Sequence, residues 1–295
     1  MFWGITESLK VMPPGCYRTG HSQAIGVYLQ RQPLKTDALL TLPDSKSEQI
    51  IQEIEQFTTL RPAFVQRGLL YKRGVLLWGP PGSGKTSTLH LLMRLIVDRL
   101  GGIAIIVDSP HLAAEALQLV RRIEPDRQVI ALMEDIDGLI SSHGIEQYLA
   151  LLDGESQVDN VVFVATTNYP ERLDRRLVDR PSRFDTVEYV GMPSDEARRI
   201  YLRHKEPNLP EVVIDEMVAV SEGLSIAHLR ELIILTQCFG RTIAAAAERL
   251  NASRHRLPNS ERSPDREEMG FGRKATVSDR LKATSQRIRQ GNGAA

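Results

Sequence analysis

Cysteine is scarce in this chain, and long apolar runs are missing from it. The 295 residues include only two cysteines, Cys16 and Cys238, and no histidine or cysteine cluster lies near either one. This scarcity argues against a disulfide framework or a zinc site and is typical of a protein kept in a reducing cytosol. No apolar run approaches the roughly 20 residues that a membrane-spanning helix needs.

An excess of charge of one sign is also missing. Lysine plus arginine and aspartate plus glutamate number 37 each, so the formal net charge is zero. This balance argues against a protein that binds nucleic acid over its whole surface. The first ten residues, MFWGITESLK, lack the basic start and apolar stretch of a signal peptide. Together, these absences predict a soluble, cytoplasmic protein without a membrane span.

Short apolar runs that alternate with helical patterns dominate the middle of the chain. The length allows about two domains. Alternating strands and helices predict right-handed βαβ units, and hence a parallel sheet covered by helices on both faces. We therefore expect an α/β three-layer sandwich over residues 46–193. Its strands are expected at GVLLWG, IAIIVDS, QVIALMED, NVVFVATTN and DTVEYVG.

The segments on either side of this region read differently. Residues 1–45 are expected to form an N-terminal extension with little core, in which residues 24–30 resemble a strand. Residues 194–250 contain only helical patterns, the last of them one long helix over 225–250, which predicts a small helical lid domain. Residues 251–295 hold ten Lys/Arg and five Asp/Glu. This composition predicts a disordered basic tail, with a nucleic-acid-binding arm as the alternative.

A glycine-rich loop carries the clearest chemical signal. GPPGSGKTS matches the pattern G-x-x-x-x-G-K-[ST] and lies between a predicted strand and a predicted helix. Backbone N–H groups and the helix N-terminus then supply positive potential for phosphate. Lys85 is expected to reach the β- and γ-phosphates, and the hydroxyl of Thr86 to ligate Mg²⁺. The predicted ATP-binding loop comprises Gly79, Pro80, Pro81, Gly82, Ser83, Gly84, Lys85, Thr86 and Ser87.

Two carboxylates end the apolar run QVIALMED. A phosphate-loop enzyme needs one acid to hold Mg²⁺ through water and a base to orient the attacking water. We assign Glu134 to the magnesium side and Asp135 to the water, although Asp before Glu is the commoner order. One alternative places Asp135 on the metal and leaves Ile136 where the base should be, which would give a slow or inert switch. Another is that both acids are solvated strand-end charges.

Further candidates for catalysis follow the strand NVVFVATTN. Asn168 at its end can hydrogen-bond the γ-phosphate or the attacking water without adding charge. Arg180 and Arg183 stand three residues apart beside Pro181, on an irregular segment. Arginines can neutralise the charge that develops on a transferring phosphoryl group, in cis or from a neighbouring subunit. The alternative for isolated arginines is a surface ion pair.

Taken together, these stretches resemble the AAA+ ATPases, specifically the AAA subgroup. The resemblance covers about residues 44–250. The motifs look most like the branch containing the mitochondrial ATPase that assembles the respiratory bc complex, which also has Glu before Asp. Similar compact proteins occur in bacteria and their phages. The matching motifs are GVLLWGPPGSGKT (Walker A), IALMEDID (Walker B), ATTN (sensor 1), LDRRLVDRPSRFD (arginine-finger box) and EGLSIAHLRELI (lid helix).

The resemblance implies a five-stranded αβα domain with a helical lid, bound ATP and Mg²⁺, and a homo-oligomeric ring, expected to be a hexamer. Arg180 and Arg183 would act on the neighbour's nucleotide, and Ile226 and Ala227 would pack near the adenine. The family's aromatic pore loop has no counterpart in VDSPHLAAEAL, where His111 and Leu112 are the nearest residues. LISSHG is expected to be a short link after the acidic strand.

Three functions fit the sequence. The first is a chaperone-like, Mg²⁺-dependent ATPase whose ring remodels, assembles or disassembles a protein complex. The second is a DNA-associated loader ATPase that uses the basic tail as its arm, and it predicts binding that weakens steeply with salt. The third is a nucleotide-dependent assembly scaffold in which hydrolysis is incidental. Nothing in the sequence identifies the protein that would be remodelled.

Overall fold

The computed structural model describes residues 11–33, 40, 42–43, 47–153, 158–180 and 182–254. They all fall within one compact unit, Met1–Arg256. The predicted basic tail lies outside the described residues, except for residues 251–254. Those four residues form the end of a helix instead of the start of a tail.

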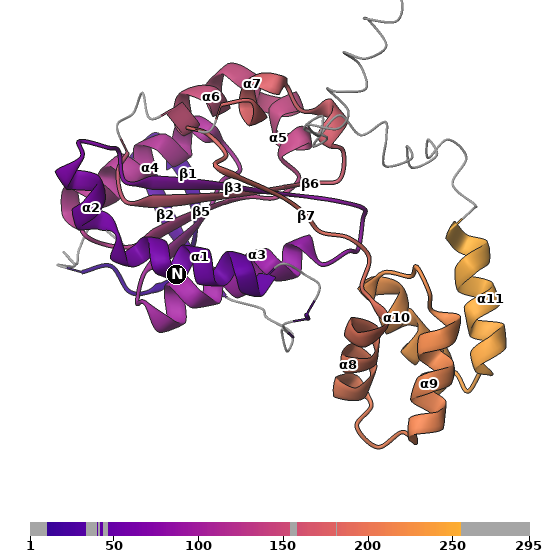
Figure 1. Ribbon diagram of the computed structural model, residues 1–295. Helices are drawn as coiled ribbons and strands as arrows, with labels where there is room; N and C mark the ends of the chain where they lie inside the picture. Colours follow the sequence, from indigo (N-terminus) through magenta and orange to yellow (C-terminus); the bar gives the residue numbers. More distant parts are fainter. Residues whose placement is uncertain are drawn as a thin grey trace, which may run out of the picture. The chain divides into compact units, whose positions relative to one another are not determined.

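A seven-stranded sheet forms the centre of the described chain, in the order β2-β1-β4-β5-β6-β3-β7 (Figure 1). From β1 along this order to β7 every neighbouring pair is parallel, so a mostly parallel sheet is confirmed. The sheet has seven strands and not the expected five, because β1 and β2 join its edge. All residues of β5 and β6 are buried, as expected for strands covered on both faces. The strands are β1 (Gly15–Ser22), β2 (Gly26–Gln32), β3 (Lys72–Trp78), β4 (Ile103–Ile106), β5 (Val129–Met133), β6 (Val161–Thr167) and β7 (Thr186–Tyr189).

Helices cover both faces of this sheet. Helices α1 and α3 lie on one face, and α4, α5 and α6 lie on the other (Figure 1). Helices α2 and α5 were not expected from the sequence. The segment LISSHG was expected to be a link, but most of it lies within α5. The helices of the α/β region are α1 (Ser47–Thr59), α2 (Arg61–Gln66), α3 (Lys85–Arg94) with a π-helical turn (Leu95–Arg99), α4 (Pro110–Ile123), α5 (Ile136–His143), α6 (Ile145–Asp153) and α7 (Arg175–Val178).

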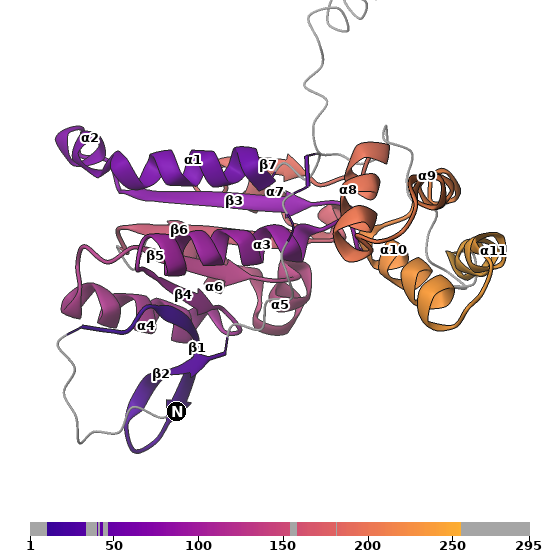
Figure 2. The same cartoon turned by 90° about the horizontal axis from the view of Figure 1, so that it is seen from below.

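The N-terminal residues differ from the expected extension. Instead of one strand-like piece, β1 and β2 form an antiparallel hairpin at one edge of the sheet (Figure 2). Strand β1 pairs in parallel with β4, so that Cys16 lies opposite Ala104. Cys16 and Tyr17 are buried, and the Tyr17 hydroxyl donates to the carbonyl of Pro13 at 2.6 Å. The hairpin therefore shares the core of the sheet.

Helices alone make up the rest of the described chain. They are α8 (Asp195–Lys205), α9 (Glu211–Val220), α10 (Ile226–Ile233) with a π-helical turn (Ile234–Cys238), and α11 (Ile243–Arg254). The single helix expected over 225–250 is in fact two, because Gly240 adopts a φ of 65° and ends the first. Leu202, Met217 and Leu229 belong to a separate core of these helices. Among the described residues, none of the helices is both long and apolar enough to cross a membrane.

Candidate nucleotide site

The glycine-rich loop leaves β3 at the carboxyl edge of the sheet and enters α3 at Lys85. Gly79 and Gly82 have φ values of 153° and 75°, which favour glycine. A Cβ at Gly79 would lie 2.1 Å from the carbonyl oxygen of Val190, and one at Gly82 would lie 2.6 Å from the hydroxyl oxygen of Ser225. These glycines therefore allow the loop to pack closely against the chain after β7 and against the start of α10.

Lys85 is held inside this loop. Its Nζ donates to the carbonyl oxygens of Gly79 at 2.7 Å and Pro80 at 2.8 Å. Burial lowers the pKa of Lys85 to about 8, and the negative charge of Asp135 opposes that shift. A phosphate would replace these neutral carbonyl acceptors with anionic oxygens, which bind an ammonium group more strongly.

A cavity of about 750 Å³ opens at this loop and is lined by residues from the ends of helices and strands. The buried hydroxyl of Ser83 has no hydrogen-bond partner among the described residues, so the loop still offers a polar atom to a ligand. The predicted site residues that line the cavity are Pro81, Gly82, Ser83, Gly84, Lys85, Thr86, Ser87, Asp135, Asn168, Ile226 and Ala227. Gly79, Pro80, Glu134, Arg180 and Arg183 are not among the lining residues.

The two strand-end acids have different surroundings. Asp135 has a φ of 47°, a left-handed conformation that costs a residue with a side chain about 1 kcal/mol or more. Its backbone N–H donates to the Thr166 hydroxyl at 3.1 Å, and its carboxylate accepts from Asn168 Nδ2 at 3.0 Å. Glu134 is exposed. The structure thus brings Asp135 and Asn168 together in the cavity and leaves Glu134 outside its lining.

Threonines that the sequence analysis did not single out support this pair. The hydroxyl of Thr167 donates to Asp137 Oδ1 at 2.7 Å and accepts from the backbone N–H of Tyr169 at 3.0 Å. These bonds fix the chain on both sides of Asn168. The third acid of the EDID run, Asp137, and the two threonines before Asn168 were the available sequence signals.

The cavity lining also includes a group of apolar residues and two further cations. Lys205 and Arg230, which the sequence analysis missed, lie in the lining and can add positive charge toward a polyphosphate. These apolar residues suit the burial of a purine base. They are Leu40, Leu42, Ile226, Ala227, Ile233 and Ile234. The cavity thus has the chemistry to hold a nucleoside triphosphate.

The donor set also bears on the metal. No group of three or more His, Cys, Asp or Glu side chains able to hold a metal ion occurs in the described part of the chain. Mg²⁺ in nucleotide enzymes takes most of its ligands from phosphates and water, with one or two from the protein. Thr86 and a strand-end carboxylate therefore suffice for an ion that arrives with its nucleotide.

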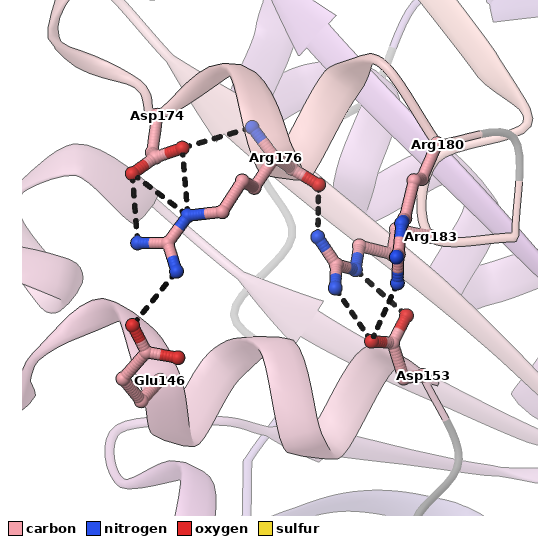
Figure 3. Close-up of polar contacts among 6 residues, drawn as sticks. All are labelled: Glu146, Asp153, Asp174, Arg176, Arg180 and Arg183. Carbon is pink, nitrogen blue, oxygen red and sulfur yellow. Dashed lines mark hydrogen bonds and ion pairs between the residues drawn. The ribbon is translucent and has the colours of Figure 1, made fainter.

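The two predicted finger arginines lie away from their own chain's nucleotide cavity and differ from each other (Figure 3). Arg183 is 5% exposed; its Nε and Nη2 donate to Asp153 at 2.7 and 2.5 Å, and its Nη1 donates to the carbonyl of Arg176. These hydrogen bonds hold the pKa of Asp153 below its ordinary value. Arg180 is 66% exposed, and its Nη1 lies 3.7 Å from Asp153. Only Arg180 presents its guanidinium to the outside.

A phosphate loop between β3 and α3, with an acid after β5 and an amide after β6, defines a P-loop nucleoside triphosphatase. Residues 75–192 match the family model described as "ATPase family associated with various cellular activities (AAA)". The chain thus carries an AAA ATPase domain, as the sequence motifs indicated.

Curated relatives agree with this family. The chain is 27% identical over 212 residues to Protein SAV of Sulfolobus acidocaldarius, covering 64% of this chain and 26% of the relative. It is 29% identical over 217 residues to the probable mitochondrial chaperone bcs1 of Schizosaccharomyces pombe, covering 67% and 46%. It is 30% identical over 178 residues to the mitochondrial chaperone BCS1 of Bos taurus, covering 55% and 41%. The alignments thus span between a quarter and a half of each relative's length.

Proposed function

We propose that this protein hydrolyses ATP with Mg²⁺ as a homo-oligomeric ring, a hexamer, and uses the cycle to remodel or assemble a protein complex. The observation that carries the proposal is the hydrogen bond between Asp135 and Asn168 inside the phosphate-loop cavity. This pair offers a carboxylate and an amide beside the phosphate loop, the groups that we assign to the attacking water. Neither group is needed merely to hold a nucleotide.

Each residue then has a defined task. Lys85 and the loop N–H groups bind the β- and γ-phosphates, and Thr86 ligates Mg²⁺, with Glu134 reaching the ion through water. Asp135 orients the attacking water and accepts its proton, while Asn168 holds the carboxylate in place. The absence of Glu134 from the cavity lining also suits the alternative in which Asp135 itself faces the ion. That alternative leaves no base at Ile136 and predicts a slow or inert switch, whereas the assignment proposed here makes Asp135 essential for turnover.

The ring is supported by the position of Arg180. An exposed arginine that does not line its own chain's cavity can complete the cavity of a neighbouring copy. In a ring of identical subunits every cavity would receive one such arginine. Arg180 would then neutralise the charge that develops on the transferring phosphoryl group.

Two observations favour assembly or remodelling over threading of an extended chain. Strand β4 ends at Ile106 and α4 begins at Pro110, so that only Val107–Ser109 connect them, and none of these residues is aromatic. Such a connection is short for a loop that grips a peptide. In addition, two of the relatives are named mitochondrial chaperones.

Steady-state ATP turnover with Mg²⁺, for the wild type and for Asp135→Asn, tests the proposal. We expect the wild type to turn over and the variant to lose at least about 100-fold, since general-base catalysis contributes that much. Binding of a fluorescent ATP analogue should persist in the variant. Asp98→Asn, which changes an acid in the turn after α3, is the matched control and should behave as the wild type.

Normal hydrolysis by Asp135→Asn would overturn the assignment of the base. If the wild type binds ATP but does not hydrolyse it, a nucleotide-dependent assembly scaffold replaces the enzyme as the better account. Size-exclusion chromatography with light scattering, with and without ATP, measures the ring directly.

A further inference from the structure

Strand β3 carries two functional segments, not one. Its carboxyl end continues into the phosphate loop, and its middle supports the backbone of the arginine segment, which we define as residues 175–180 and 182–184. We propose that Gly74 of β3 is a positioning residue for Arg180, because only a residue without a side chain lets the arginine segment lie on this strand. The proposal rests on the function proposed above, in which Arg180 serves a neighbouring copy.

The contact at Gly74 is between backbones. A Cβ at this position would lie 1.8 Å from the carbonyl oxygen of Arg183, 2.8 Å from its carbonyl carbon and 3.0 Å from Cα of Phe184. Ordinary van der Waals contact begins at about 3.4 Å, and backbone atoms cannot rotate out of the way as a side chain tip can. Any other residue at position 74 must therefore displace the arginine segment or the strand.

Backbone conformation does not explain the glycine. Gly74 is not among the residues with positive φ, and it lies in a regular strand that pairs with β6 and β7. Its N–H donates to Asp185 Oδ2 at 2.9 Å, which fastens the residue just beyond the arginine segment to the same point of β3. Space alone requires glycine here.

A second attachment holds the segment from the other side. Arg183 is clamped by Asp153 at the end of α6, and Lys72 of β3 donates to the carbonyl of Leu152 next to it. The end of α6, the start of β3 and the arginine segment therefore form one polar assembly (Figure 3 shows the part around Asp153). The segment has little room to settle elsewhere.

A shift of the Arg183 backbone would also move Arg180. The backbone N–H of Arg183 donates to the carbonyl of Arg180 at 3.0 Å, which closes a tight turn between the two arginines. The buried, clamped Arg183 thus serves as the base from which the exposed Arg180 projects. Misplacing a transition-state group by about 1 Å can cost about 100-fold in rate.

Gly74→Ala should affect only one of the two functions of a subunit. It should displace the Arg180 that acts on the neighbouring subunit's nucleotide, and it should leave the subunit's own phosphate loop able to bind ATP. Mixed rings separate these two effects. Lys85→Ala subunits lack the phosphate lysine but keep the arginine segment, and Arg180→Ala subunits keep the cavity but lack the arginine.

Alone, Gly74→Ala should turn over ATP about 100-fold more slowly than the wild type and should bind a fluorescent ATP analogue as the wild type does. Mixing it with Lys85→Ala should restore turnover, because the intact Arg180 of the partner reaches its cavity. Mixing it with Arg180→Ala should not. Gly138→Ala is the matched control, since a Cβ there meets nothing within 4 Å, and it should keep wild-type turnover.

The outcomes distinguish the two proposals. If Arg180→Ala and Lys85→Ala do not complement each other, the ring with a shared arginine is wrong. If they do, but Gly74→Ala either turns over normally or is not restored by Lys85→Ala, the positioning role of Gly74 is wrong. Should Gly74→Ala not fold, Asp153→Asn takes its place in the same mixtures, because it loosens the same segment from α6. Wild-type turnover of Asp153→Asn would then overturn the inference.

Discussion

The nucleotide cavity and the arginine segment both depend on charged side chains, but they use them in opposite ways. In the cavity, Lys85 makes only exchangeable contacts with its own loop, and the Ser83 hydroxyl has no partner among the described residues. In the arginine segment, each nitrogen of Arg183 already has a partner, and the side chain is buried. The ligand-binding loop thus keeps polar groups available to a ligand, whereas every side-chain nitrogen of the structural arginine already has a partner within the fold.

The same contrast occurs within the arginine segment itself. Arg180 and Arg183 are three residues apart and face the same carboxylate of Asp153 (Figure 3). The exposed arginine makes one long contact with it, and the buried one makes two short ones. Sequence spacing made the two arginines look equivalent, and the structure separates them into a projecting side chain and its support.

The largest effect should follow from removing the projecting side chain. We expect Arg180→Ala to lower ATP turnover by about 1000-fold, because arginine fingers contribute that much or more. The melting temperature should stay at the wild-type value, since exposed ion pairs contribute little to stability. Steady-state turnover and thermal unfolding, measured on the same preparation, check both parts. A large loss of stability would show that Arg180 belongs to the support.

Removing the support should act mainly on the fold. Arg183→Ala leaves Asp153 with only its long contact to Arg180, and breaking a largely buried pair in this way costs about 3 kcal/mol of unfolding free energy. Urea unfolding measures this loss, with Arg180→Ala as the control that retains stability. If Arg183→Ala is as stable as the wild type, Arg183 is not the structural support of the arginine segment.

The lysine of the cavity should respond to pH. Its pKa is lowered from 10.5 to about 8 by burial, so the nucleotide-free protein loses this charge above pH 8. Because phosphate requires the ammonium form, ATP binding should take up a proton between pH 8 and 10.5, and apparent affinity should fall by about tenfold per pH unit there. Calorimetry at pH 9 in buffers of different ionisation enthalpy measures the proton.

The stability of the folded protein depends on pH in the opposite direction from ATP binding. Since the folded pKa of Lys85 is depressed, the unfolded chain holds this proton more tightly, and the nucleotide-free protein gains stability from this group as pH rises from 8 toward 10.5. Lys85→Met should lack both the gain in stability and the proton uptake. If Lys85→Met shows the same gain in stability, the lysine is not its source.

The smallest effect is expected where an ion pair is fully exposed. Arg176 pairs with Asp174 and with Glu146 at the surface of the arginine segment. Glu146→Gln should leave the melting temperature and ATP turnover unchanged, because solvent screens such pairs. A clear loss of turnover would mean that Arg176 also acts on a neighbouring nucleotide.

Local chemistry made the phosphate loop, the Asp135–Asn168 edge and most strands predictable. A strand, a glycine loop and a helix follow one another within a few residues, so their pattern is complete in the sequence. The burial of Arg183 against Asp153 and the pairing of the β1–β2 hairpin with β4 were not predictable in this way. Asp153 lies 30 residues before Arg183, and the partner of Cys16 is Ala104. Such pairings depend on how distant segments meet, which no short pattern contains.

The division of 225–250 into two helices shows a different limit. Apolar spacing continues across Gly240, so periodicity alone favours one helix, while the left-handed conformation of that glycine decides otherwise. Lys205 and Arg230 were missed because cations on a helix surface are usually solvated. Only the fold brings them to the phosphate loop.

The hairpin at the edge of the sheet sets a practical limit on how this protein can be shortened. A fragment that starts near residue 46, where the predicted α/β domain begins, would uncover the backbone edge of β4 along Ile103–Ile106, which now pairs with β1. Unpaired apolar edges recruit other strands and lead to aggregation. A working fragment must therefore begin upstream of Gly15, so that β1 still covers this edge.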